Sequence, residues 1–325
     1  MTSPPAPVAR IDRPLHGIAF ILLGASLFPV QDVLIKSLSG DYAVLQIVFV
    51  RSLVALGLFA LLLWRERSSA TFGIQQPWLH AVRGLLGLVS FTTYYMAIAA
   101  LPLATVTSVA FAAPLFITAL SALVLGEQVD RRAWSAVVVG FVGVLVVLRP
   151  GAVAFEPAAL LAVLSALCYA ISQTITRHLG RTDSGATIVF TATLVSVLVA
   201  ATSGLTASGG GQAAGLHPSI AFLVRGWVVP PWGALGRMAL CGLISGVGIY
   251  CLTQAYRVAP ASTVSPFEYV MIGWAVLWGY VFWRDVPSPA TVLGVATTVA
   301  AGVYVLHHQA RAQRERRREA PAPEG

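Results

Sequence analysis

Long apolar stretches dominate this sequence and leave few folds open to it. A helix needs about 20 mainly apolar residues to cross the hydrocarbon core of a bilayer, because each residue adds about 1.5 Å along the axis. Their hydrophobicity is continuous and does not alternate, which favours helices over barrel strands. The sequence therefore predicts an all-α polytopic membrane protein with ten transmembrane helices, at 15–38, 42–63, 78–100, 103–125, 133–149, 157–179, 186–206, 235–256, 260–283 and 289–307.

Charged residues are too few for a soluble protein. They make up 10% of the 325 residues, against about 25% in soluble domains, while 57% of the residues are hydrophobic. Of the 21 Lys and Arg, fifteen fall on the side of the N-terminus across the predicted spans, five fall on the other side, and Arg51 lies within a span. Positive residues favour the cytoplasmic side, so we expect a multi-pass protein of the inner (plasma) membrane with both termini in the cytoplasm. This bias accounts for the net charge of +8, and no nucleic-acid partner is expected.

The two halves of the chain resemble each other. A shift of 141 residues places 32–36 on 173–177, and a shift of 158 residues places 97–127 on 255–285. The two shifts differ by 17 residues, which matches the long connection at 207–234. Each half holds five predicted spans, and because five is odd, the second half must enter the membrane from the opposite side. The pattern predicts an inverted 5+5 repeat, an architecture of many secondary transporters.

This repeat defines the expected organisation of the chain. The apolar middle of the 207–234 connection, at 219–229, is expected to lie on the membrane surface or to dip into it. The expected parts are a cytoplasmic N-terminal segment at 1–14, a first five-helix repeat at 15–150, a second at 156–307 and a basic cytoplasmic tail at 308–325.

Several segments resemble one transporter family. They are AIAALPLATVTSVAFAAPLFITALSALVLGE at 97–127, GFVGVLVVL at 140–148, AYRVAPASTVSPFEYVMIGWAVLWGYVFWRDVPSP at 255–289, DVLIK at 32–36 and FVR at 49–51. Together they are similar to the drug/metabolite transporter (DMT) superfamily, in its ten-helix branch with two EamA repeats.

The resemblance implies a secondary transporter that moves a small organic metabolite by alternating access. Vitamins, amino acids and nucleoside-like compounds are among the solutes it implies. SPFEY at 265–269 resembles the branch that contains bacterial riboflavin and S-adenosylmethionine importers. One departure concerns Arg51, because the matching residue of the second half is Ala192.

Two charged residues are predicted near the middle of the membrane. Arg51 lies in the second span and Glu268 in the ninth, each about 12–14 Å from its end of the span at 1.5 Å per residue. A charge at such a depth costs about 2.5–3.5 kcal/mol on insertion scales, so it is a candidate for function. Arg51 would bind a carboxylate or phosphate of the solute or neutralise Glu268, and Glu268 would bind a cationic group or carry a coupling proton. A structural ion pair between helices is the alternative.

Other polar residues of the spans could complete a pocket. Asp32 and Lys36 are four residues apart on one helical face, and a local ion pair is the simpler interpretation of Lys36. Aromatic faces stack on planar solutes and amides orient them by hydrogen bonds. The candidate substrate-binding or coupling residues are therefore Glu268, Arg51, Asp32, Gln173, Tyr269, Tyr94, Tyr169, Gln254 and Trp274.

Motifs for catalysis or nucleotide binding were sought without success. The sequence contains no GxxxxGK[ST], HExxH or GxSxG, so we expect no enzyme, no cofactor and no metal site. The expected partners are a small-molecule solute and the lipid bilayer, and Gly242-x3-Gly246 offers a possible contact for a homodimer. A membrane-embedded sensor or assembly subunit on the same scaffold remains the main alternative, with an integral-membrane enzyme less favoured.

Overall fold

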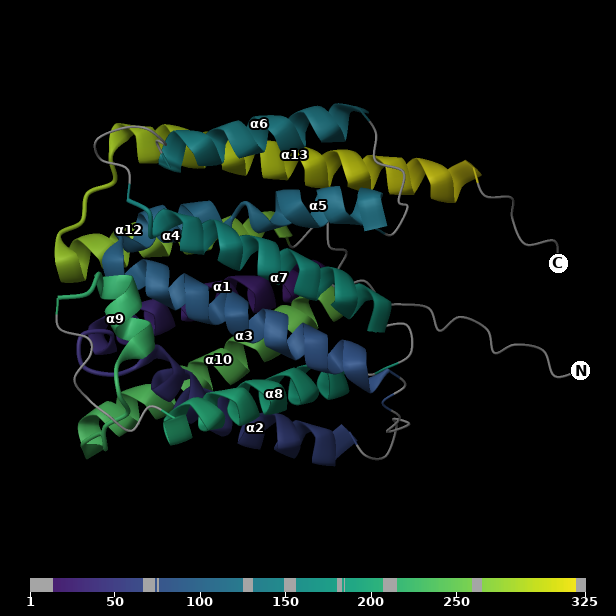
Figure 1. The fold of residues 1–325 in the computed structure, drawn as a ribbon. Helices are drawn as coiled ribbons and strands as arrows, with labels where there is room; N and C mark the ends of the chain where they lie inside the picture. Colours follow the sequence, from purple (N-terminus) through teal and green to yellow (C-terminus); the bar gives the residue numbers. More distant parts are fainter. Residues whose placement is uncertain are drawn as a thin grey trace, which may run out of the picture.

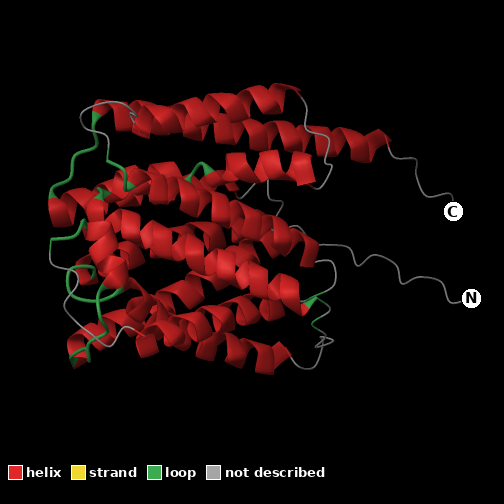
Figure 2. Ribbon diagram, viewed as in Figure 1, coloured by secondary structure: helices red, strands yellow, loops and turns green. Residues whose placement is uncertain are grey.

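The protein is a bundle of long helices that run roughly side by side (Figure 1). The computed structural model describes residues 14–66, 74, 76–124, 131–148, 156–179, 183, 185–206, 215–258 and 265–319. Within these ranges only helices and loops occur (Figure 2). The elements are α1 (Pro14–Leu38), α2 (Val44–Glu66), α3 (Pro77–Ala100), α4 (Leu103–Ala110), α5 (Ala113–Val124), α6 (Arg131–Leu148), α7 (Ala159–Leu179), α8 (Gly185–Thr206), α9 (Pro218–Val224), α10 (Trp232–Val258), the 3-10 helix η1 (Ser265–Tyr269), α12 (Val270–Trp283) and α13 (Pro289–Glu319).

Each predicted apolar stretch falls on helix in the described chain. Six helices are long and apolar enough to cross a membrane, namely α1, α2, α3, α7, α8 and α10. Shorter apolar helical segments occupy Leu103–Ile117, Val137–Leu148, Phe267–Trp283 and Pro289–Tyr304. The outer helices expose large apolar side chains such as Leu145, Leu160 and Leu198, as expected for surfaces that face lipid. The all-helical prediction is thus confirmed for the described residues, as are its apolar spans.

The predicted tail differs from expectation in one respect. Helix α13 continues through the basic sequence to Glu319 rather than ending near residue 307. Its last part is rich in Ala, Gln, Arg and Glu, which all have high helix propensity, so the helix extends beyond its apolar portion.

Two of the predicted spans are interrupted at matching places. Helix α4 ends at Ala110, where Pro114 cannot donate the hydrogen bond that would continue it, and α5 begins at Ala113. In the second half, η1 ends at Tyr269 and α12 follows. Phe111 and Tyr269 correspond under the shift of 158 residues, and their rings pack against each other with centroids 5.1 Å apart.

Helix packing follows the same correspondence between halves. Helix α1 packs on α10 and α3 on α7, while α2 contacts α8 and α10, and α3 also contacts α8. Helices α6 and α13 form a separate pair along one edge of the bundle (Figure 1). If each helix is exchanged for its sequence counterpart in the other half, this set of contacts maps onto itself.

A glycine allows the closest helix approach in the centre of the bundle. A Cβ atom placed on Gly242 of α10 would overlap the backbone oxygen of Arg51 in α2 and would lie 2.8 Å from the Val54 Cβ. Gly246 likewise faces Leu58 of α2. The Gly242-x3-Gly246 motif therefore packs α10 on α2 inside the chain, and the suggestion that it offers a dimer contact is wrong.

We expect Gly242→Leu to prevent stable packing, because the new side chain would meet the backbone of α2, which cannot move aside. The measurement is the yield and the thermal melting of the detergent-purified protein. Gly236→Leu is the matched control, since no atom lies within 4 Å of a Cβ placed at Gly236 on the same helix. Wild-type melting of Gly242→Leu would contradict the packing described.

Candidate functional site

Three polar side chains from three helices meet at Tyr95. The Tyr95 hydroxyl of α3 accepts a hydrogen bond of 2.7 Å from Gln31 Nε2 of α1 and one of 2.8 Å from Arg51 Nη1 of α2. All three residues are buried, with exposed fractions of 1% for Tyr95, 2% for Gln31 and 4% for Arg51. Tyr95 therefore ties the first three helices together around a charged group.

A carboxylate lies beside this group on the next tyrosine. Asp32, 5% exposed, accepts a hydrogen bond of 2.8 Å from the Tyr94 hydroxyl, which also lies 3.3 Å from Thr107 Oγ1 of α4. Asp32 and Arg51 are close enough for their charges to interact, but they make no direct ion pair among the described residues. We call Gln31, Asp32, Arg51, Tyr94 and Tyr95 the arginine cluster.

The expected local ion pair between Asp32 and Lys36 does not form. Lys36 Nζ lies 3.8 Å from Asp285 Oδ2, donates a 2.7 Å hydrogen bond to the Leu101 carbonyl, and sits 4.9 Å from the centroid of the Trp283 ring. A lysine at a helix end reaches toward polar groups at the bundle end, whereas Asp32 lies deeper and is within reach of Tyr94.

The arginine of the cluster has fewer polar partners than its chemistry allows. Arg51 Nε and Gln31 Oε1 are buried without a hydrogen-bond partner. The guanidinium lies over the rings of Phe91 and Tyr95, with 4.8 and 5.4 Å to their centroids. Such contacts are worth about 2 kcal/mol when desolvated, and they support the charge without pairing it. Donor and acceptor capacity thus remains inside the cluster.

The remaining candidate residues lie elsewhere. Tyr169 of α7 interacts with Gln173, one turn further on, and with the charge of Glu268 in η1. Gln173 corresponds to Asp32 in the other half, so this glutamate cluster of Tyr169, Gln173 and Glu268 lies on the counterpart of α1. Arg51 makes no ion pair with Glu268 among the residues that the structure describes, because its nearest bond is to Tyr95.

Three further candidates are placed around these clusters. Tyr269 packs on Phe111, and its hydroxyl is buried without a partner. Trp274 of α12 donates a 2.9 Å hydrogen bond from Nε1 to Ser26 Oγ of α1. Gln254 is partly buried on α10. The structure therefore brings Asp32, Tyr94 and Arg51 together and places Glu268, Gln173, Tyr169 and Tyr269 in a second region.

Sequence reasoning missed a polar cluster where α3, α7 and α8 meet. His80 Nε2 lies 2.7 Å from Asp183 Oδ2 and its Nδ1 lies 2.7 Å from Thr191 Oγ1. Arg83 donates hydrogen bonds of 2.6 Å to Thr176 Oγ1 and 3.1 Å to the Ile188 carbonyl. The available signal was the spacing of His80 and Arg83, which share one face of α3.

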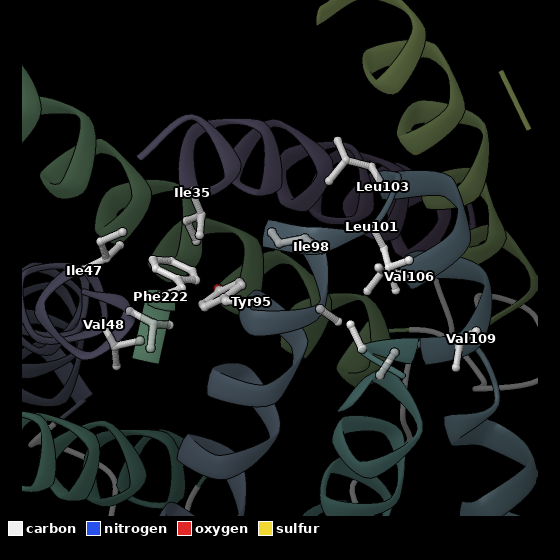
Figure 3. Close-up of a cluster of buried hydrophobic side chains, with 14 of the residues drawn as sticks. Ile35, Ile47, Val48, Tyr95, Ile98, Leu101, Leu103, Val106, Val109 and Phe222 are labelled. Carbon is white, nitrogen blue, oxygen red and sulfur yellow. The ribbon is translucent and has the colours of Figure 1, made fainter. Parts of the chain in front are cut away.

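The connection between α8 and α10 covers the arginine cluster. Phe222 of α9 is fully buried and lies beside Tyr95, Ile47 and Val48 (Figure 3). Around it, residues 215–231 are fastened to the ends of the first three helices by side chain to backbone hydrogen bonds. These are Ser219 Oγ to the Met96 carbonyl at 2.7 Å, Arg225 Nη1 to the Ser39 carbonyl at 2.7 Å, and Gln46 Nε2 to the Val228 carbonyl at 2.5 Å.

This covering segment was expected to lie on the membrane surface or dip into it. It instead packs on the helix ends, because Phe222 and Ala221 fill an apolar gap in the core while the polar groups of the segment satisfy carbonyls at the ends of α1 and α3. We call residues 215–231 the cap segment.

Comparison with known proteins agrees with this architecture. The model of the EamA-like transporter family matches residues 15–149 and again 156–306. A riboflavin transporter of Rhizobium johnstonii is 31% identical, over 79% of this chain and 80% of the relative. A pseudopaline exporter of Pseudomonas aeruginosa is 29% identical over 90% of this chain and 96% of the relative.

Two more distant matches cover nearly the whole chain. An S-adenosylmethionine uptake transporter of Rickettsia prowazekii is 23% identical over 91% of this chain and 94% of the relative. A solved crystal structure matches with a TM-score of 0.59 and 20% identity, covering 92% of this chain and 97% of the other, and it supports the fold alone.

The long apolar helices and the buried charges between them define a polytopic membrane protein. The chain belongs to the EamA-like transporter family, within the DMT superfamily. It is a membrane transporter of small metabolites, as are the relatives named above.

We expect Tyr95→Phe to destabilise the protein, because it removes the acceptor shared by Gln31 and Arg51. Each buried donor left unpaired costs about 1–3 kcal/mol. The measurement is the melting temperature of the purified protein, which should fall. Tyr280→Phe is the matched control, since Tyr280 is 49% exposed. Equal melting of the two variants would show that the Tyr95 hydroxyl does not hold the cluster.

Proposed function

We propose that the chain is a secondary transporter that moves a small organic metabolite by alternating access of two inverted five-helix halves. The observation that carries this proposal is the set of helix contacts, which maps onto itself when the halves are exchanged. The interruptions at Phe111 and Tyr269, which match under the shift and face each other, support it further. Two halves built alike and inserted in opposite senses can exchange conformations, which exposes one site to each side in turn.

The orientation of this transporter follows from its charges. The excess of Lys and Arg on the side of the N-terminus supports an inner-membrane protein with both termini in the cytoplasm. The cap segment then faces the exterior. Under this proposal the structure is closed to the outside, because the cap segment and the Lys36–Asp285 ion pair join the helix ends there.

The arginine cluster is the proposed solute site. It holds opposite charges on α1 and α2 in a buried position, and it retains a donor and an acceptor without partners. The glutamate cluster is proposed to take part in coupling or in solute binding from the other half. Riboflavin, S-adenosylmethionine and pseudopaline are the solutes named for relatives, and this range supports a metabolite of similar size.

Counterflow in proteoliposomes tests transport directly. Liposomes loaded with unlabelled riboflavin or S-adenosylmethionine should transiently accumulate the labelled solute, whereas a sensor would bind it without accumulation. Glu268→Gln should abolish accumulation and keep the wild-type yield of folded protein, because the charge that acts on Tyr169 is lost.

Asp41→Asn is the matched control, since Asp41 is an exposed carboxylate in the connection between α1 and α2. It should transport like the wild type. Wild-type flux in Glu268→Gln would remove Glu268 from the mechanism.

The cap segment offers a separate test of the closed outer end. In a background without the native cysteines, Met96→Cys should react slowly with a membrane-impermeant thiol reagent, because Met96 is 7% exposed beneath Ser219. Adding Phe222→Ala should speed the reaction at least about tenfold, since each 1.4 kcal/mol of lost closing free energy is a factor of ten. Val229→Ala, at a residue that is 96% exposed, should leave the rate unchanged. Equal rates in all three proteins would contradict a sealing role.

A further inference from the structure

We propose that the arginine cluster selects solutes that carry an amino-acid-like zwitterion, with the carboxylate on Arg51 and Tyr95 and the ammonium group on Asp32 and Gln31. The inference rests on the proposed function, because it names the solute class of the same site. It is drawn from the donors and acceptors that the cluster leaves unused and from the way it separates its two charges.

The anionic end of the solute is assigned to α2 and α3. A guanidinium has five N–H donors in a planar fork that matches a carboxylate, and Arg51 Nε is buried without a partner. The Tyr95 oxygen accepts hydrogen bonds from Gln31 and Arg51, and its own proton has no acceptor among the described residues. Arg51 and Tyr95 therefore present two N–H or O–H donors to one anionic group.

The cationic end is assigned to α1. Asp32 receives a hydrogen bond from Tyr94 on Oδ2, and a carboxylate can accept about four such bonds. The neighbouring residue contributes Gln31 Oε1, a buried acceptor without a partner. An ammonium group has three N–H donors and no acceptor, so it fits a carboxylate and an amide oxygen side by side.

The separation of the two charges argues for a ligand between them. A structural ion pair would bring Arg51 and Asp32 into direct contact, which offsets the cost of burying both. Here each charge is held by its own tyrosine hydroxyl, and the Tyr94 and Tyr95 rings lie with centroids 5.8 Å apart. The adjacent tyrosines thus keep the charges near each other and unpaired.

Other solute classes fit these groups less well. A phosphate or simple carboxylate would satisfy Arg51 but would stand close to the negative charge of Asp32. A neutral solute would leave both charges buried without an opposite charge, and an unpaired buried polar group costs about 1–3 kcal/mol or more. Only a solute with both charges satisfies the two ends together.

The experiment begins with binding to the purified full-length protein. The proteinogenic amino acids, S-adenosylmethionine and riboflavin are each tested by the shift in melting temperature, and calorimetry gives the affinity of any that bind. We expect a zwitterion to bind, and its methyl ester and its N-acetyl derivative to bind at least about tenfold more weakly, since each lacks one charge.

Variants assign each end of the solute. Arg51→Gln should weaken the zwitterion about 10- to 100-fold, as expected for loss of about 1.5–3 kcal/mol at a charged hydrogen bond, but should leave the ester unaffected. Asp32→Asn should weaken the zwitterion similarly and leave the N-acetyl derivative unaffected. Arg237→Gln, at an exposed arginine of α10, is the matched control and should bind like the wild type. Arg51→Lys keeps the charge and should restore part of the affinity if Arg51→Gln folds poorly.

The outcomes separate this inference from the proposed function. Binding of riboflavin with no zwitterion in the panel, or equal weakening of zwitterion and ester by Arg51→Gln, overturns the inference. Absence of binding by every zwitterion in the panel also overturns it. Riboflavin counterflow in those cases would leave the proposed transport standing, whereas binding of a zwitterion without counterflow of any solute would overturn transport and keep the site.

Discussion

The hydrogen bond from Arg51 to the Tyr95 hydroxyl is the interaction around which the first half of the bundle is arranged. It places a guanidinium in the interior of an apolar bundle, where an isolated charge is costly. The surroundings reduce that cost with two aromatic rings and the nearby carboxylate of Asp32. Gly242 lets α10 reach the backbone of Arg51, and Phe222 closes the space beside Tyr95. A change to this bond would therefore be felt by α1, α2, α3 and the cap segment.

The two halves share a plan but not their polar groups. Helices α1 and α7 occupy matching positions in the packing, yet α1 carries Asp32 and α7 carries Gln173. Arg51 has Ala192 as its counterpart, and the cap segment has no equivalent in the first half. Repetition supplies the scaffold on which two similar bundles can move against each other, and the unequal residues supply recognition.

Hydrophobic stretches predicted the helices well, because a membrane span is defined by the composition and length of one local segment. The interruption before Ala113 was harder to place, since Pro114 alone does not tell whether a helix kinks or stops. The partners of Arg51 and Lys36 depend on how helices distant in sequence pack. Depth along a span made Glu268 a reasonable partner for Arg51, but the rotation of α2 turns Arg51 toward Tyr95. The seat of Phe222 depends on a gap formed by several helices, which no single segment encodes.

The one-sided cap segment means that the two ends of this bundle are not energetically equivalent. A symmetric pair of halves would give inward-facing and outward-facing forms of similar free energy, whereas the extra contacts of Ser219, Arg225 and Gln46 favour one form over the other. The resting population is then biased before any solute arrives, and apparent affinity differs between the two sides by the same factor. Net flux still follows the gradients, because a passive bias in the protein changes occupancy and rate but supplies no driving force.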